Sequence, residues 1–138
     1  MSKSIEECIY EVLSSSLRIT TAVSTRISPS YRPGTSALPC IVYEISSVSG
    51  VPMLSDVTQV TGECVVTVYA DSVMGSIDAG DAVLDAMDGT TGTLDSTNYS
   101  FRFLSVSYDY EPSDEGGDDF GTYSRELAFT FVKDVEDL

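Results

Sequence analysis

The alternation of apolar and polar residues over two long stretches is the feature that most constrains this chain. It runs from Gln59 to Ala70 and again from Gly121 to Val132. A period of two residues is that of a β-strand with one buried face, so the chain must build a sheet that a second layer covers. On the first strand the expected buried face carries Val60, Cys64, Val66, Val68 and Ala70, and on the last strand it carries Tyr123, Arg125, Leu127, Phe129 and Phe131.

Each of these strands has an expected partner before it in the sequence. Residues Cys40 to Val48 follow Pro39 with β-branched and aromatic side chains, and a short connection leads to the strand from Gln59, which predicts an antiparallel hairpin. Residues Phe101 to Tyr110 precede the last strand in the same way. The segments between are expected to be mainly irregular: 23–39, where only Val23 to Ile27 suits a short strand; 90–100, a polar connection; and 112–120, a loop.

Two segments have the three-to-four residue spacing of an amphipathic helix. The first, Ser4 to Ser16, has a capping-box pattern in Ser4 and Glu7 and ends in a run of serines. The second, Ser72 to Met87, is followed by Gly89 at the position of a C-terminal cap. Its expected apolar stripe consists of Val73, Ile77, Val83, Leu84 and Met87.

The order of elements is helix, hairpin, helix, hairpin. It predicts an α+β fold with a largely antiparallel sheet of four to five strands and two helices packed on one face. A chain of 138 residues fits a single domain, 1–138, and 42% hydrophobic residues argue against disorder. We expect neither a signal peptide nor a membrane span, because no apolar run is long enough.

The composition argues against most catalytic chemistry. The chain has no histidine, which removes the commonest general base and every Ser-His or Cys-His arrangement. Its three cysteines, Cys8, Cys40 and Cys64, fall in apolar patterns and are expected to be small buried side chains in a reducing cytoplasm. We therefore expect no enzymatic activity, no catalytic residues, no metal and no cofactor.

Acidic residues dominate the charge: 22 Asp and Glu against 7 Lys and Arg give a formal net charge of −15. Such a surface repels phosphate and disfavours nucleic-acid binding, although DNA can still pass beside it. The acids gather in two places. Asp114, Glu115, Asp118 and Asp119 lie in the 112–120 loop without the alternate spacing of a calcium loop, and Asp78, Asp81 and Asp85 lie at helical spacing. The simpler interpretation is that both groups face solvent.

Three segments together resemble the tail-terminator, or tail-completion, family of long-tailed phages. The first is the N-terminal helix with Thr25-Arg-Ile and the lead-in from Leu38 to Ile45. The second runs from Gly62 to Asp71 and on to the helix with Ala82 to Gly89. The third is the closing pair of strands, Phe103 to Pro112 and Gly121 to Phe131. The resemblance covers nearly the whole chain. The sequence departs from the family in its charge and in the length of its acidic loop.

The resemblance implies a non-enzymatic hexameric ring that caps the tail tube, stops its polymerisation and meets the head connector. It places the protein in the tail-neck region of the virion and, during assembly, in the host cytoplasm. Its implied partners are copies of itself, the tail tube protein and the head connector, with double-stranded DNA passing through unbound and no membrane involved. A head-side connector or neck adaptor stays open as an alternative, and so, from another class, does a metal-dependent hydrolase using carboxylates.

Two sets of residues are candidates for these contacts. The apolar connection and the second face of the following strand are expected to meet a neighbouring subunit or the tube, because exposed apolar groups in a loop often mark a contact. This set is Val51, Pro52, Met53, Leu54, Val65 and Tyr69. The acids near the DNA path are expected to keep a repulsive gap, with the helical stripe favoured over the loop. This set is Asp78, Asp81, Asp85, Asp114, Glu115, Asp118 and Asp119.

Overall fold

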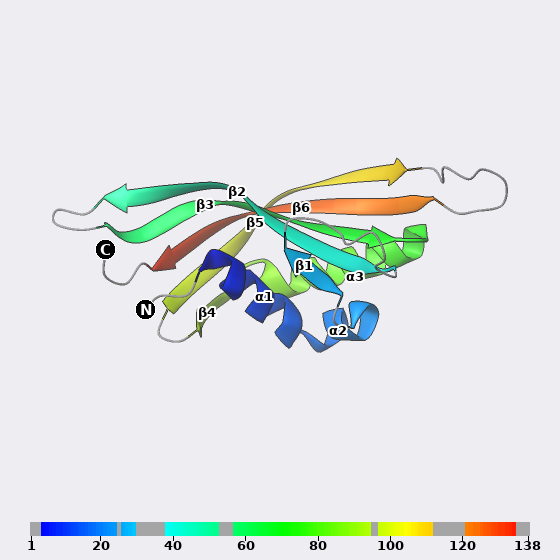
Figure 1. The fold of residues 1–138 in the computed structure, drawn as a ribbon, viewed down its shortest axis with the longest axis horizontal. Helices are drawn as coiled ribbons and strands as arrows, with labels where there is room; N and C mark the ends of the chain where they lie inside the picture. Colours follow the sequence, from blue (N-terminus) through cyan, green and yellow to red (C-terminus); the bar gives the residue numbers. More distant parts are fainter. Residues whose placement is uncertain are drawn as a thin grey trace.

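The computed structural model describes residues 4–24, 26–29, 38–52, 57–94, 97–111 and 121–134. In this part of the chain three helices and six strands follow one another, and Figure 1 shows them along the sequence. The elements are α1 (Ile5–Ser15), α2 (Leu17–Val23), β1 (Ile27–Pro29), β2 (Cys40–Pro52), β3 (Val57–Ala70), α3 (Val73–Met87), β4 (Thr91–Leu94), β5 (Thr97–Glu111) and β6 (Thr122–Asp134).

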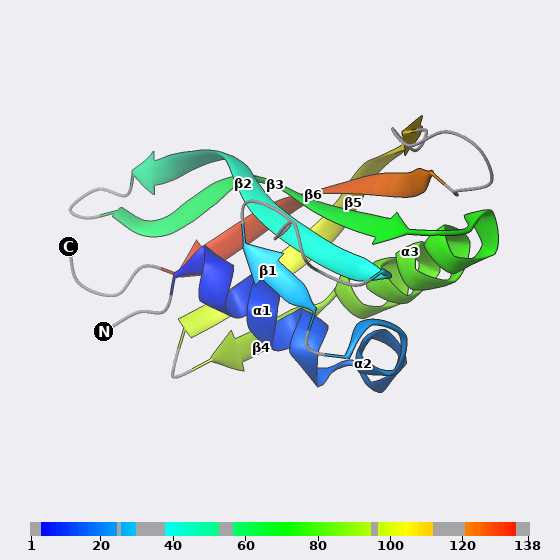
Figure 2. The same cartoon turned by 45° about the vertical axis from the view of Figure 1, so that its right-hand side comes forward.

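The strands form one sheet in the order β1-β2-β3-β6-β5-β4. All neighbours are antiparallel except β1 and β2, which are parallel, so the sheet is mixed. The helices lie together on one side of it (Figures 1 and 2). The predicted α+β class is confirmed, but four to five strands and two helices were too few. The missed elements are α2, which follows the serine run expected to end the first helix, and β4, which has only four residues.

The N-terminal helix begins as its sequence predicts. Ser4 caps α1, and its hydroxyl accepts from the Glu7 N–H while the Glu7 carboxylate accepts from the Ser4 N–H. The helix ends within the serine run, but the chain then enters a second helix. Ser16 has extended backbone angles and caps α2 through its hydroxyl, which accepts from the Ile19 N–H at 3.3 Å. Val23 therefore ends a helix, and the short strand expected from Val23 to Ile27 lies instead at Ile27–Pro29.

The connection expected at 90–100 was the other error. It contains all of β4 and the start of β5, which pair from Thr91 with Ser100 to Leu94 with Thr97. Threonine and serine at half of these positions hide the alternation, although Tyr99 and Thr97 are buried. The hairpin of β2 and β3 is confirmed, and both strands extend beyond their predicted ends, to Pro52 and from Val57.

The core lies between the helices and the face of the sheet that was predicted to be buried. On β3 that face buries Cys64, Val66 and Val68, and on β6 it buries Leu127, Phe129 and Phe131. The stripe of α3 differs from the prediction, since Val73 is 49% exposed and Ile77 and Leu84 are only partly buried. The residues that α3 buries are mostly small, which brings the helix close to the sheet: Ser76, Ala79, Gly80, Ala82, Val83 and Met87.

The prediction for the cysteines is confirmed. Cys8, Cys40 and Cys64 are free thiols and all are buried. Burial raises the pKa of the Cys64 thiol to about 12 and that of Cys8 to about 11. A thiol held protonated in this way is a poor nucleophile at neutral pH.

Candidate assembly surfaces

The sheet ends in two hairpin arms that point in opposite directions. The arm of β2 and β3 lies at one end, and the arm of β5 and β6 lies at the other, with α3 beneath it (Figure 1). Each arm is long because its strands have 13 to 15 residues, which exceeds the usual strand of about five or six residues. The arms give the subunit two separate surfaces beyond the core.

The face of the sheet opposite the helices, called here the open face, is hollowed into a groove of about 630 Å³. Side chains from successive strands form a row across it, because Ser47 pairs with Glu63, Glu63 with Thr130, and Thr130 with Arg102. The floor of the groove is therefore lined by small polar side chains, together with the Glu63 carboxylate and the Arg102 guanidinium. Arg102 is exposed, and within the described residues no ion pair or side-chain hydrogen bond engages its guanidinium.

The predicted interface residues fall in three places. Val65 and Tyr69 lie on the open face and are partly buried, on strand β3. Val51 and Pro52 belong to the end of β2 and pair with β3, so they are part of a strand and not of a loop. Met53 and Leu54 lie outside the described residues.

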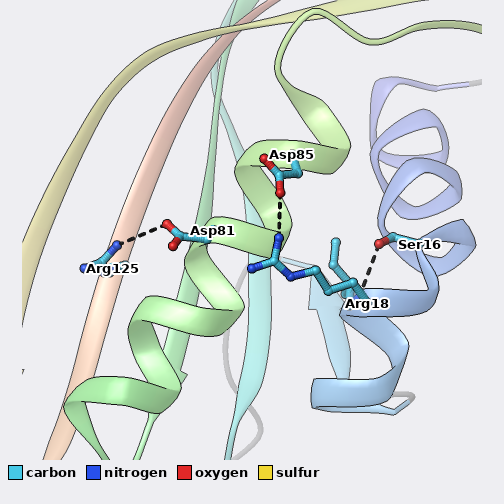
Figure 3. Close-up of polar contacts among 6 residues, drawn as sticks. Ser16, Arg18, Asp81, Asp85 and Arg125 are labelled. Carbon is cyan, nitrogen blue, oxygen red and sulfur yellow. Dashed lines mark hydrogen bonds and ion pairs between the residues drawn. The ribbon is translucent and has the colours of Figure 1, made fainter.

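The three predicted channel acids of α3 are all exposed, and two of them make ion pairs within the subunit (Figure 3). Asp85 meets Arg18 of α2 at 2.5 Å, and Asp81 lies 3.8 Å from Arg125 of β6. The stripe is therefore partly neutralised by the chain's own cations. Asp78 has no ion pair with any residue that the structure describes. The four loop acids, Asp114, Glu115, Asp118 and Asp119, lie outside the described residues.

The ion pair between Arg18 and Asp85 is expected to contribute little to stability. Both side chains are more than half exposed, so water and salt screen their attraction. A double-mutant cycle with Arg18→Gln and Asp85→Asn, followed by urea unfolding, should give a coupling of about 0.2–1 kcal/mol that falls in high salt. The matched cycle with Asp78→Asn should show no coupling, because Asp78 lies two turns away from Asp85. A coupling well above this range would mean that the pair is structural.

Aromatic residues and one arginine cover the helix-side face of the β5–β6 arm. The Arg125 guanidinium lies over the Tyr108 ring at 4.5 Å, and the rings of Tyr110 and Tyr123 are 4.5 Å apart. The Arg125 Nε is buried, and it has no hydrogen-bond partner among the residues that the structure describes. Tyr108 is 64% exposed. Tyrosine and arginine are enriched at protein interfaces, so this face has the composition of a contact surface.

A smaller hollow of about 390 Å³ lies beside α1. Its wall combines carboxylates with two tyrosines, and burial raises the pKa of one of them, Tyr43. The sequence analysis did not identify it, because its residues are far apart in the chain. They are Glu6, Glu7, Tyr10, Glu11, Pro29, Tyr43 and Leu94.

Within the described ranges, no group of three or more His, Cys, Asp or Glu side chains is placed to hold a metal ion. Within the same ranges, none of the helices has the length and apolar character needed to cross a membrane.

Two surfaces were missed by sequence reasoning altogether. The open-face groove needs the pairing of four strands, which periodicity does not provide. Leu104 and Tyr108, the exposed apolar residues of the β5–β6 arm, were expected to lie in a strand. The sequence did not show that this strand forms an edge of the sheet. One sequence signal could have indicated the groove. Arg102 is one of only seven basic residues, and it lies within a strand whose neighbouring residues are uncharged.

Comparison with known proteins rests on solved structures. No protein-family model matches the chain, and no curated protein matches its sequence. A chain from the structure of the virion of a native gene transfer agent (GTA) particle aligns over 92% of this chain and 92% of its own, with a TM-score of 0.73 and 17% identity. A second solved structure covers 96% of this chain and 98% of its own at 16% identity and a TM-score of 0.50. The chain thus shares its fold with a component of a gene transfer agent virion.

Proposed function

We propose that this chain is a structural subunit of a virion, and specifically a tail terminator that forms a hexameric ring on the tail tube. The observation that carries the proposal is the shared fold with a chain of the gene transfer agent virion, which extends over 92% of both chains. The resemblance of three segments to the tail-terminator family points the same way. In this role the ring stops tube polymerisation and joins the tail to the head connector.

The surfaces described above suit assembly better than catalysis. The groove on the open face is lined mostly by serine, threonine and glycine, with Glu63 and Arg102 as its charged residues. Among the described residues, no hydrogen bond joins Glu63 to a hydroxyl that it could activate as a nucleophile. The arms offer exposed apolar and aromatic side chains at both ends of the subunit. A ring requires two different, complementary surfaces on each subunit, and two arms at opposite ends meet that requirement. We therefore propose that the protein is not an enzyme.

The role of the acids in this ring is to face the DNA path without holding DNA. Carboxylates repel phosphates over a Debye length of about 8 Å at physiological salt, so only those near the channel matter. Asp78 is the best probe of the helical stripe, because its replacement disturbs neither of the two ion pairs of α3.

The ring is tested on the purified chain, alone and with its proposed partner, the tail tube protein of the same virion. We expect native mass spectrometry to give a hexamer, and electron microscopy to show a ring at one end of each tube and tubes that stop lengthening when the chain is added. Binding to the head connector with no effect on tubes would favour a neck adaptor. A chain that stays monomeric and binds neither partner would overturn the proposal.

A further inference from the structure

Two strands of the sheet run far beyond their outer neighbours and leave main-chain edges unpaired. β1 pairs with β2 only at residues 41–43, and β4 pairs with β5 only at residues 97–100. From Glu44 onward β2 is paired on one side only, with β3, among the strands that the structure describes. From Leu104 onward β5 is paired in the same way, with β6 alone. These free edges lie on the two opposite arms (Figure 1).

Hydrogen bonds near each edge show which residues point their backbone N–H and C=O groups away from the paired strand. On β5, the Phe103 N–H donates to Asp88 and the Tyr110 N–H donates to the Asp109 carboxylate, both at 2.9 Å, so neither faces β6. The register shift between Phe103 and Ser105 changes the alternation, and Val106 and Tyr108 therefore share the orientation of Tyr110. These residues have their side chains on the helix side of the sheet.

The edge of β2 follows the same rule. The Ile41 N–H donates to the Arg26 carbonyl on β1's side, at 2.9 Å, so residues with helix-side side chains face outward. After the register shift between Ile45 and Ser47, Val48 takes this orientation. On both edges, therefore, the residues whose side chains lie on the helix side are those whose backbone N–H and C=O groups are available to a new strand.

Exposed apolar side chains gather on the same two edges. Val48 is 54% exposed on β2, and on β5 the exposed fractions are 51% for Leu104, 64% for Tyr108 and 46% for Tyr110. Monomeric proteins protect such edges with charges, prolines or short strands. The stretches Ile45–Ser49 and Leu104–Tyr108 contain neither a charge nor a proline. Their composition is that of a strand that acquires a partner.

We propose that the free edge of β5 in one subunit pairs with the free edge of β2 in a second copy, so that the sheets of neighbouring subunits join. The inference deepens the proposed ring function and rests on it. β2 and β5 run in opposite directions within the sheet, so two copies in the same orientation bring these edges together as an antiparallel pair. The free stretches lie at opposite ends, so successive copies are staggered along the strands, as strands are in a closed barrel.

Charge favours this pairing over a pairing of like edges. The β5 edge ends in Asp109 and Glu111, and two β5 edges would bring these acids together in a chain of net charge −15. The β2 edge is uncharged from Ile45 to Ser49 and accepts the acidic strand without repulsion. A contact between two different edges also repeats from copy to copy and closes into a ring, whereas a contact between like edges stops at a dimer.

Cysteine cross-linking tests the pairing directly. Val48→Cys is combined in turn with Leu104→Cys, Val106→Cys, Tyr108→Cys and Tyr110→Cys, and each double variant is oxidised gently under assembly conditions. The three native thiols are buried and do not compete. We expect one or two adjacent combinations to give a ladder of disulfide-linked oligomers that ends at the ring, while each single variant gives dimers at most. Equal and weak cross-linking in all four combinations would count against a defined edge contact.

Lysine substitutions test the proposed pairing of β5 with β2 without cross-linking. Val48→Lys and Tyr108→Lys place a charge on the helix-side face of each edge, and we expect at least a tenfold loss of association. Ser49→Lys and Ser105→Lys are the matched controls on the open face of the same strands, and they should assemble as the unmodified chain does. Circular dichroism verifies that all four variants fold. Loss of assembly in the controls alone would place the contact on the open face and overturn the edge pairing.

The outcomes separate this inference from the proposed function. A ring that forms normally, but ignores the lysine variants and yields no cross-linked ladder, overturns the edge pairing and leaves the ring proposal standing. Open, linear disulfide-linked oligomers support the edge pairing and overturn the closed ring. A strictly monomeric chain, with and without the tube protein, overturns both.

Discussion

Replacing Gly62 with alanine is expected to destabilise the protein by about 3 kcal/mol, at the upper end of the cost of overpacking a core. Gly62 lies on β3 and pairs with Val48 of β2, just beyond the register shift of β2 between Ile45 and Ser47. A Cβ atom added there would stand 2.0 Å from the Ser47 carbonyl oxygen and 2.8 Å from the Phe131 ring. Neither neighbour can withdraw cheaply, because one is main chain in a strand ladder and the other is a fully buried side chain. Urea unfolding followed by circular dichroism measures the loss.

Gly75→Ala provides the matched control for this change. Its added methyl group would meet the Ser72 hydroxyl at 2.9 Å, which is the movable end of a side chain. Alanine also suits a helix better than glycine by up to about 1 kcal/mol, which offsets any disturbance of the cap. We expect Gly75→Ala to stay within about 1 kcal/mol of the unmodified protein. If Gly62→Ala were equally mild, the close approach of β2 to β3 at this point would be wrong.

The parts of the fold that sequence could predict are those in which one periodic signal continues for many residues. The buried faces of β3 and β6 were predicted correctly for most of their residues, because burial of one face imposes the alternation directly. Val60, Tyr123 and Arg125 of the predicted faces are only partly buried. The start of α1 was correct because a capping box depends only on residues three apart. The glycine at the end of α3 was also correct: Gly89 has a φ of +72°, which glycine adopts without strain.

The short elements of the fold were missed or misplaced. β1 has three residues and lies just after the strand expected from Val23 to Ile27, and the seven-residue helix α2 is capped by the same serine that ends α1. The stripe of α3 was misassigned because large residues were expected to be buried. The helix instead packs through small residues, and the Arg125 stem lies against Gly80, where an added Cβ would be 2.7 Å from Arg125 Cδ.

The candidate surfaces were predictable only in kind. The helical spacing of Asp78, Asp81 and Asp85 predicted that they share an exposed side of α3, and all three are exposed. The sequence did not show that Asp81 and Asp85 meet arginines from β6 and α2, because those partners lie 44 and 67 residues away in the chain. It also did not show the free edges, which depend on where each outer strand ends. Both the ion-pair partners and the free edges are set by contacts between residues that are far apart in the sequence.

The stability of the protein is expected to fall steeply above pH 9 because of its buried thiols. Burial raises the pKa of Cys64 from 9.0 to about 12 in the folded chain, while an unfolded chain keeps the ordinary value. Between these values the unfolded chain loses a proton that the folded chain retains, so rising pH favours unfolding. The contribution is fully present below pH 9 and is lost as the pH rises towards 12, at about 1.4 kcal/mol for each pH unit. Cys8 adds the same effect up to about pH 11.

The Cys64→Ala variant isolates this effect from the general repulsion of an acidic chain at high pH. We expect the variant to be less stable than the unmodified protein at pH 7, because it loses buried volume, and to lose less stability between pH 9 and 11, because it has one ionisable thiol fewer. Val66→Ala is the matched control: it removes volume from the same buried face of β3 but no thiol, so its free energy of unfolding should stay a constant amount below that of the unmodified protein at every pH. Urea unfolding at half-unit steps of pH measures all three. If the Cys64→Ala and unmodified curves ran parallel, as the Val66→Ala curve should, the Cys64 thiol would not be desolvated in the folded protein.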